Sequence, residues 1–174
     1  MRMEYLEILL TDVKKQYIDS IVKQELKITT DLVTSSHFYD EFENKDMEYY
    51  DDINLERYFS NPNTGNIFVK ELVLGESIKN VMIVISCDAD FGDITLNFSE
   101  SDFMTDNIDM LRTKIISIVN RLIEIQRKYK ISSIRLGYES TIDDENVILD
   151  ISNGNIVIPN EFQGQLAFAV KQLY

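Results

Sequence analysis

Residues 81–98 read VMIVISCDADFGDITLNF, and this stretch predicts the centre of the fold. Its first half is a continuous apolar run, residues 81–85, which is typical of a strand that is covered on both faces. In its second half, Ile94, Leu96 and Phe98 alternate with polar residues, which is the pattern of a second strand. The two halves therefore predict a central β-hairpin.

Further strands are predicted on both sides of this hairpin. Residues 66–74 (NIFVKELVL) precede it, and the short connections favour antiparallel pairing of these three strands as a meander. Residues 133–138 are predicted as another strand. Residues 146–151 and 155–158 flank Asn153-Gly154, the preferred pair for a type I′ turn, and predict a second hairpin.

Four helices are predicted. Residues 105–130 carry the strongest helical pattern, with an apolar face and neither Gly nor Pro. Residues 4–27 carry an apolar stripe at helical spacing and are predicted as an amphipathic helix, with a strand over residues 3–10 and a helix from residue 12 as the alternative. Short helices are predicted over residues 52–59, capped by Asp51 or Asp52, and over residues 161–173, capped by Asn160 with Gln163 completing a capping box.

The predicted fold class is α+β. It consists of a mainly antiparallel sheet of about six strands, one long helix packed across a face, an N-terminal helix and a short C-terminal helix. With 174 residues, of which 44% are hydrophobic, the chain has the size and composition of a single domain over residues 1–174.

The charge and cysteine content narrow the function classes. A formal net charge of −13 argues against nucleic acid or an anionic membrane as the partner and favours a basic protein. Cys87 is the only cysteine, and its place at the end of an apolar strand indicates a buried side chain instead of a nucleophile. The N-terminus has no signal-peptide core, and no run of about 18 apolar residues is present, so we expect a protein of the cytoplasm. Only two prolines, no tryptophan and abundant Ile, Asn, Asp and Lys indicate a bacterial chain.

The turn of the central hairpin holds the candidate metal ligands, Asp88, Asp90 and Asp93. Closely spaced carboxylates can bind a hard cation, but these do not match the spacing of an EF-hand loop. His37 is the only histidine, which excludes a His-based catalytic dyad elsewhere and a His/Cys zinc cluster. No known nucleotide-binding or catalytic motif is present. We therefore predict no cofactor, no metal and no enzymatic activity, with these aspartates as weak metal candidates.

The most unusual composition lies in residues 38–59. This segment holds eight carboxylates against Lys45 and Arg57, a net charge of −6, together with seven aromatic residues. Solvated loops seldom carry so many aromatic side chains, so part of the segment must pack on the domain or meet a partner. The predicted partner-binding residues are Tyr39, Asp40, Glu41, Glu43, Asp46, Glu48, Tyr49, Tyr50, Asp51 and Asp52, with the three tyrosines as aromatic anchors.

Two further acidic segments, residues 86–109 and 139–150, contain no basic residue. If they share one side of the fold with residues 38–59, the three segments form a negative surface suited to capturing a basic protein. The leading hypothesis is a bacterial immunity-type protein that neutralises a basic toxin, above all a nuclease domain. The alternatives are an acidic interaction or regulatory domain with another partner, and a metal-dependent enzyme centred on Asp88, Asp90 and Asp93.

Overall fold

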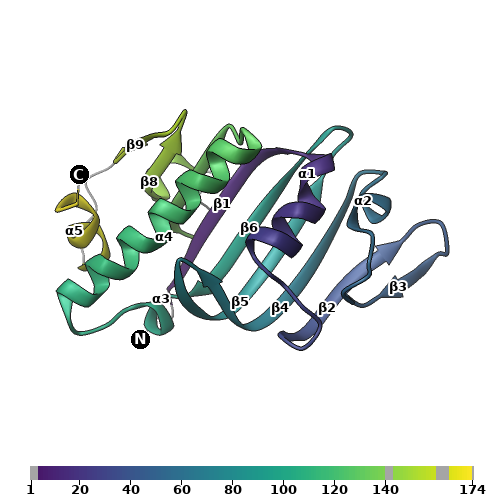
Figure 1. Cartoon of the computed structure of the whole chain (residues 1–174), viewed down its shortest axis with the longest axis horizontal. Coiled ribbons are helices and arrows are strands. Elements are labelled where there is room, and N and C mark those ends of the chain that lie inside the picture. The colour runs from purple at the N-terminus through teal and green to yellow at the C-terminus, as the bar shows by residue number, and fades with distance from the viewer. Residues whose placement is uncertain (1–3, 140–142, 160–164, 174) are drawn as a thin grey trace.

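The structure is a computed structural model that describes residues 4–139, 143–159 and 165–173. Within these residues, one sheet of nine strands runs through the molecule in the order β3-β2-β4-β5-β6-β1-β7-β8-β9 (Figure 1). All neighbouring strands pair antiparallel. The strands are β1 (Tyr5–Lys14), β2 (Val33–Asp40), β3 (Lys45–Met47), β4 (Asn63–Leu74), β5 (Glu76–Cys87), β6 (Phe91–Ser99), β7 (Ser133–Tyr138), β8 (Val147–Ser152) and β9 (Asn155–Val157).

The helix α4 (Ile108–Tyr129) lies across one face of this sheet, with α5 (Gln165–Lys171) beside it (Figure 1). The buried face of α4 joins the same core as Ile67, Ile83 and Leu96, which are neighbours on β4, β5 and β6. None of the described helices combines the length and apolarity needed to cross a membrane. The other helices are α1 (Lys15–Ser20), the π-helix η1 (Ile21–Glu25), α2 (Leu55–Tyr58), α3 (Glu100–Phe103) and the 3-10 helix η2 (Asp144–Asn146).

Two parts of the predicted fold class are wrong. The sheet has nine strands among the described residues instead of about six, because β1, β2 and β3 are not among the six predicted strands. The predicted N-terminal helix over residues 4–27 is replaced by β1, followed by α1 and the π-helix. The alternative of a strand over residues 3–10 is closer, although β1 continues to Lys14.

The central position of β1 explains this error. β1 pairs with β6 along one edge and with β7 along the other. Ile8 and Leu10 are buried on one face and Leu9 is buried on the other, so the polar-apolar alternation of a half-exposed strand is lost. At Asp12, where φ is 55°, the register with β6 shifts and Val13 returns to the core. The resulting spacing of apolar residues also fits a helical stripe.

Other elements agree with the prediction. The structure is α+β with antiparallel pairing, the central hairpin is β5–β6, and α4 confirms the long helix. Asn153 and Gly154 both have positive φ in the β8–β9 turn. The short helix α2 is capped by Asn54 and not by Asp51 or Asp52. α5 overlaps the predicted C-terminal helix, whose predicted start and capping box lie outside the described residues.

A buried carboxylate joins the N-terminal helical segment to α4. Glu25, at the end of the π-helix, is 5% exposed. Its carboxylate accepts hydrogen bonds from Arg121 at 2.5 Å, Lys128 at 2.6 Å and the hydroxyl of Tyr129 at 2.7 Å. Burial alone would raise the pKa of Glu25, but the hydrogen bonds and the two positive charges together lower it below the ordinary value.

We expect Glu25→Gln to destabilise the fold by about 1.5 to 3 kcal/mol, because a neutral amide loses the charge-assisted hydrogen bonds that the buried carboxylate accepts. Denaturant unfolding measures this change. Glu124→Gln is the matched control, because Glu124 also pairs with Arg121 but is exposed; it should cost no more than about 0.5 kcal/mol. Equal effects of the two substitutions would contradict the structural role of Glu25.

The same pair of variants tests the pH dependence. Because the pKa of folded Glu25 is lowered from 4.5, its contribution is fully present above pH 4.5 and is lost as the pH falls toward the folded pKa. The stability difference between the native chain and Glu25→Gln should therefore be constant at neutral pH and shrink in acid. A difference that grows on acidification would show that the sign is wrong.

Candidate functional site

The β2–β3 hairpin forms one end of the molecule, on the right in Figure 1 and far from α4 and α5. It lies at the edge of the sheet, where β3 pairs only with β2 among the described residues. Asp40 and Lys45 form the last pair before the turn, and Tyr39 faces Asp46. Residues 38–59, the acidic and aromatic segment of the sequence, therefore form the β3 edge of the sheet and the chain that follows it.

Asp40 shapes the turn of this hairpin. Its Oδ1 atom accepts hydrogen bonds from the backbone N–H groups of Phe42, at 2.9 Å, and Glu43, at 3.1 Å. This is the local bonding that makes aspartate favourable at turns. The side chain is 4% exposed, and its other oxygen, Oδ2, is turned toward Arg57. Asn44 completes the turn with a φ of 52°.

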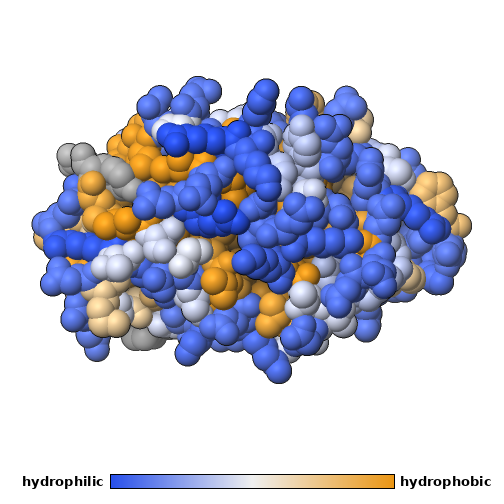
Figure 2. Space-filling view, viewed as in Figure 1, coloured by the Kyte–Doolittle hydropathy of each residue, from blue (hydrophilic) through white to orange (hydrophobic). Residues whose placement is uncertain are grey.

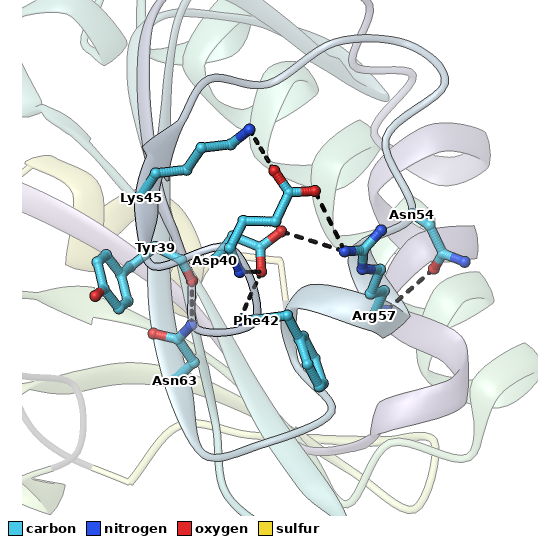
Figure 3. Close-up of polar contacts among 8 residues, drawn as sticks. Tyr39, Asp40, Phe42, Lys45, Asn54, Arg57 and Asn63 are labelled. Atoms are coloured by element: carbon cyan, nitrogen blue, oxygen red, sulfur yellow. Dashed lines mark hydrogen bonds and ion pairs between the residues drawn. The ribbon is translucent and has the colours of Figure 1, made fainter.

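Phe38 anchors the hairpin on the inner face. It is 1% exposed and packs against Tyr58 and Phe59 at ring centroid distances of 5.9 and 6.2 Å. The ring lies so close to Gly65 of β4 that a Cβ atom there would overlap with it. Since residues alternate along a strand, the inward position of Phe38 directs Tyr39 to the opposite face. Figure 3 shows Tyr39 pointing away from Asp40 and Arg57.

The three predicted aromatic anchors differ in their exposure to solvent. Tyr39 and Tyr50 are 37% and 44% exposed, but Tyr49 is 4% exposed. The Tyr49 hydroxyl donates to the backbone oxygen of Ile28 at 3.0 Å, and burial, followed by the charges of Asp51 and Asp19, raises its pKa to about 12. Tyr49 is thus a structural residue.

Phe42 is missing from the predicted site. It stands in the hairpin turn with 66% of its surface exposed, the largest exposed fraction of any large hydrophobic residue described. Figure 2 shows that this end of the molecule is mainly hydrophilic, with a light-orange apolar patch at its tip. The sequence signal that could have identified it is Asp40, whose turn-forming side chain places a residue two positions later at the tip.

The predicted carboxylates differ in their availability. Asp51 accepts hydrogen bonds from the backbone and hydroxyl of Thr30, at 2.6 and 2.9 Å, and so holds the loop after β3. Glu41 accepts from Asn61 at 2.7 Å, and Asp46 lies 3.6 Å from His37, but both stay exposed. Glu48 and Asp52 are exposed, and neither forms an ion pair with any residue that the structure describes.

Arg57 of α2 faces the hairpin turn. Its Nη2 atom lies 3.7 Å from Asp40 Oδ2 and 3.6 Å from Glu43 Oε1, and its Cζ atom lies 5.9 Å from the centre of the Phe42 ring. Glu43 also pairs with Lys45 through its other oxygen. Figure 3 shows Asp40 and Arg57 turned toward one another, beside Phe42.

The three acidic segments do not share one side of the fold. Residues 88–93 lie at the same end of the sheet as the hairpin turn, because Asn63 pairs with Cys87 and also donates to the backbone of Tyr39 at 2.8 Å. The acidic residues of 100–109, and those of 139–150 that precede β8, lie toward the opposite end, where Tyr5 pairs with Ser99 and Leu6 with Tyr138. The predicted continuous negative surface is therefore divided.

Two of the three aspartates at the β5–β6 turn have structural partners for their side chains, while Asp90 is exposed. Asp88 Oδ1 accepts the backbone N–H groups of Phe91 and Asp90, which lower the pKa of Asp88, and Asp93 Oδ1 accepts the N–H of Asp12. No group of three potential ligands close enough to hold a metal occurs among the described residues. The neighbouring thiol of Cys87 is buried, and burial raises its pKa to about 12.

The two neighbouring tyrosines offer a direct test of which anchors are free. We expect Tyr49→Phe to destabilise the fold by about 1 kcal/mol, because it leaves the carbonyl of Ile28 without its buried donor. Tyr50→Phe, at an exposed ring, should change stability by less than about 0.5 kcal/mol. Thermal or denaturant unfolding measures both. A larger effect at Tyr50 would contradict the assignment of Tyr49 as structural.

Comparison with known proteins gives one match to a family. A sequence model described as the PABL017 Cdi1I immunity protein matches residues 4–154. No curated protein sequence matches the chain.

Two solved structures are similar. A chain in the crystal structure of the toxic C-terminal tip of CdiA from Pseudomonas aeruginosa in complex with immune protein has a TM-score of 0.67 at 12% identity. The match covers 87% of this chain and 96% of that one, and it shows a shared fold. The Pseudomonas aeruginosa T6SS protein PA0821 has a TM-score of 0.45 at 8% identity, covering 78% of this chain and 40% of that one, which is too weak to bear on the function.

Proposed function

The chain belongs to the PABL017 Cdi1I immunity protein family, and from this premise we propose that it binds a toxin domain with a basic surface, above all a nuclease, and blocks it. The solved structure of similar fold supports a toxin as the class of partner, since it holds a CdiA toxic tip together with its immune protein. The proposed action is inhibition by binding, without catalysis, in the bacterial cytoplasm.

The proposed contact surface is the β2–β3 hairpin with the loop that follows it. The observation that carries this proposal is an exposed aromatic side chain at the hairpin tip, Phe42, among exposed carboxylates. Large rings supply most of the contact energy of an interface when they enter a pocket of the partner. Phe42 replaces Tyr49 as an anchor, beside Tyr39 and Tyr50. The proposed rim carboxylates are Glu41, Glu43, Asp46, Glu48, Asp51 and Asp52.

The charge of this surface supports a basic partner. Residues 38–59 carry a net charge of −6, and all their carboxylates except Asp40 belong to exposed residues. Exposed charge of one sign speeds the encounter with a partner of the opposite sign. A nuclease domain has such a surface, because its substrate is a chain of phosphates. Carboxylates of the hairpin would occupy the place of those phosphates.

We expect neutralisation of the hairpin to weaken binding to the toxin domain that this chain inhibits, which is sought first among the products of neighbouring genes. The variant combines Glu41→Gln, Glu43→Gln, Asp46→Asn and Glu48→Gln. Its affinity should fall roughly tenfold to a hundredfold at low salt, mainly through slower association, and its dependence on salt should weaken. Binding to surface-immobilised toxin at several salt concentrations measures the association and dissociation rates, and from them the affinity.

The control carries the same change in charge at the other end of the sheet. It combines Asp106→Asn, Glu139→Gln, Asp143→Asn and Glu145→Gln, all at exposed residues. This control should keep its affinity within about twofold of the native value, because exposed charges beyond a Debye length are screened. Equal losses of affinity in both variants would show that only the net charge of the chain matters. No loss of affinity in either variant would refute the hairpin as the contact surface.

The aromatic tip is tested separately from the charge. We expect Phe42→Ala to leave the association rate within about twofold and to speed dissociation roughly tenfold or more, because an anchor ring acts after the encounter. The same immobilised toxin measures both rates. An unchanged dissociation rate would remove Phe42 from the contact surface.

A further inference from the structure

We infer that Asp40, Glu43 and the ring of Phe42 form a guanidinium site, which Arg57 occupies in the free chain and an arginine of the toxin takes over in the complex. The inference rests on the proposed function for the identity of its occupant. The site itself is argued from contacts within this chain. The inference specifies the chemical group that the hairpin binds, a guanidinium, which the negative charge of the hairpin alone does not.

The carboxylate of Asp40 is fixed in place, but only one of its two oxygens accepts hydrogen bonds from the residues that the structure describes. Its Oδ1 atom accepts two backbone hydrogen bonds, which fix the group in place. Its Oδ2 atom accepts no hydrogen bond from any described residue and is not fully buried, although the side chain as a whole is only 4% exposed. The cation that pairs with Oδ2 is Arg57, at 3.7 Å, which is longer than a hydrogen bond.

The guanidinium of Arg57 is the kind of group that this site binds, but its distances to the two carboxylates are long. Its guanidinium lies between two carboxylates and near an aromatic ring, and its side chain is still 53% exposed. The helix α2 does not depend on this side chain, because the backbone N–H of Arg57 is capped by Asn54 at 3.1 Å and α2 is anchored by Leu55 and Tyr58. The guanidinium can therefore leave the site while α2 stays in place.

The arrangement favours arginine over lysine. A planar guanidinium can donate to Asp40 Oδ2 and Glu43 Oε1 together and lie against the ring of Phe42, whereas an ammonium is a point charge. Lys45 already pairs with the other oxygen of Glu43. Because backbone hydrogen bonds preorganise Asp40, ordering the site costs an arriving arginine little free energy.

The first experiment uses a probe that does not require the toxin, an acetylated tri-arginine amide titrated by NMR. Arg57→Ala should bind it roughly threefold to tenfold more tightly than the native chain, because the internal competitor is gone. Adding Asp40→Asn to Arg57→Ala should remove that gain. The control Arg127→Ala makes the same change in net charge at an exposed residue of α4 and should show no gain. Arg57→Met, which keeps the aliphatic stem, should bind like Arg57→Ala.

Three results would overturn the inference. The first is that Arg57→Ala and Arg57→Met, shown to be folded by their amide spectra, bind tri-arginine no more tightly than the native chain. The second is that tri-lysine gains as much as tri-arginine, because the site would then respond to charge alone. The third is that the gain survives Asp40→Asn.

The toxin then separates this inference from the proposed function. If the toxin binds the native chain, Arg57→Ala should bind it equally or more tightly. A loss of tenfold or more would mean that Arg57 contacts the toxin itself, which would overturn the exchange. If the toxin does not bind the native chain while the tri-arginine results hold, the proposed function fails and the guanidinium site remains.

Discussion

The fold depends on the insertion of β1 between β6 and β7. Strands β2 to β6 form one part of the sheet and β7 to β9 the other, and the sequence separates them by α4. β1 pairs with β6 of the first part and with β7 of the second, so its backbone hydrogen bonds join the two parts into one sheet. This pairing places the first strand in the middle of the sheet, with buried residues on both of its faces. The π-helix that follows places Glu25 against the end of α4, so the same N-terminal segment also holds the long helix.

At the far edge of the sheet, the hairpin combines structural and exposed residues at adjacent positions. Phe38 and Tyr49 are buried and fix the position of β2 and β3, while Tyr39 and Tyr50 are exposed. Asp40 uses one oxygen to hold the turn and leaves the other toward Arg57. A rigid turn lowers the entropy that an exposed anchor such as Phe42 loses on binding. The proposed contact surface is thus fixed at its base and charged at its rim.

The acidity of the chain is distributed between two ends of the sheet. The end near the hairpin turn combines carboxylates with an exposed aromatic tip, and there the β5–β6 turn adds its own aspartates. Asp88 accepts two backbone N–H groups within the turn and Asp93 accepts that of Asp12, so these two residues contribute charge while also holding the structure. The opposite end of the sheet is acidic as well but lies away from the hairpin. Because carboxylates lie at both ends of the sheet, the hairpin surface is distinguished by its exposed aromatic tip together with its charge, and not by charge alone.

Patterns within the sequence suffice to predict the α+β class, the β5–β6 and β8–β9 hairpins, α4 and the acidic, aromatic character of residues 38–59. These features follow from local patterns, since alternation, turn residues and helical periodicity act between near neighbours. Tertiary structure alone decided that residues 5–14 form a strand, because burial on both faces erases the alternation that identifies a strand. It also decided that Tyr49 and Asp40 are buried and Phe42 is exposed. Exposure depends on which surface a residue meets across the sheet, and Phe38 against β4 and Tyr49 against Ile28 are contacts between segments distant in sequence.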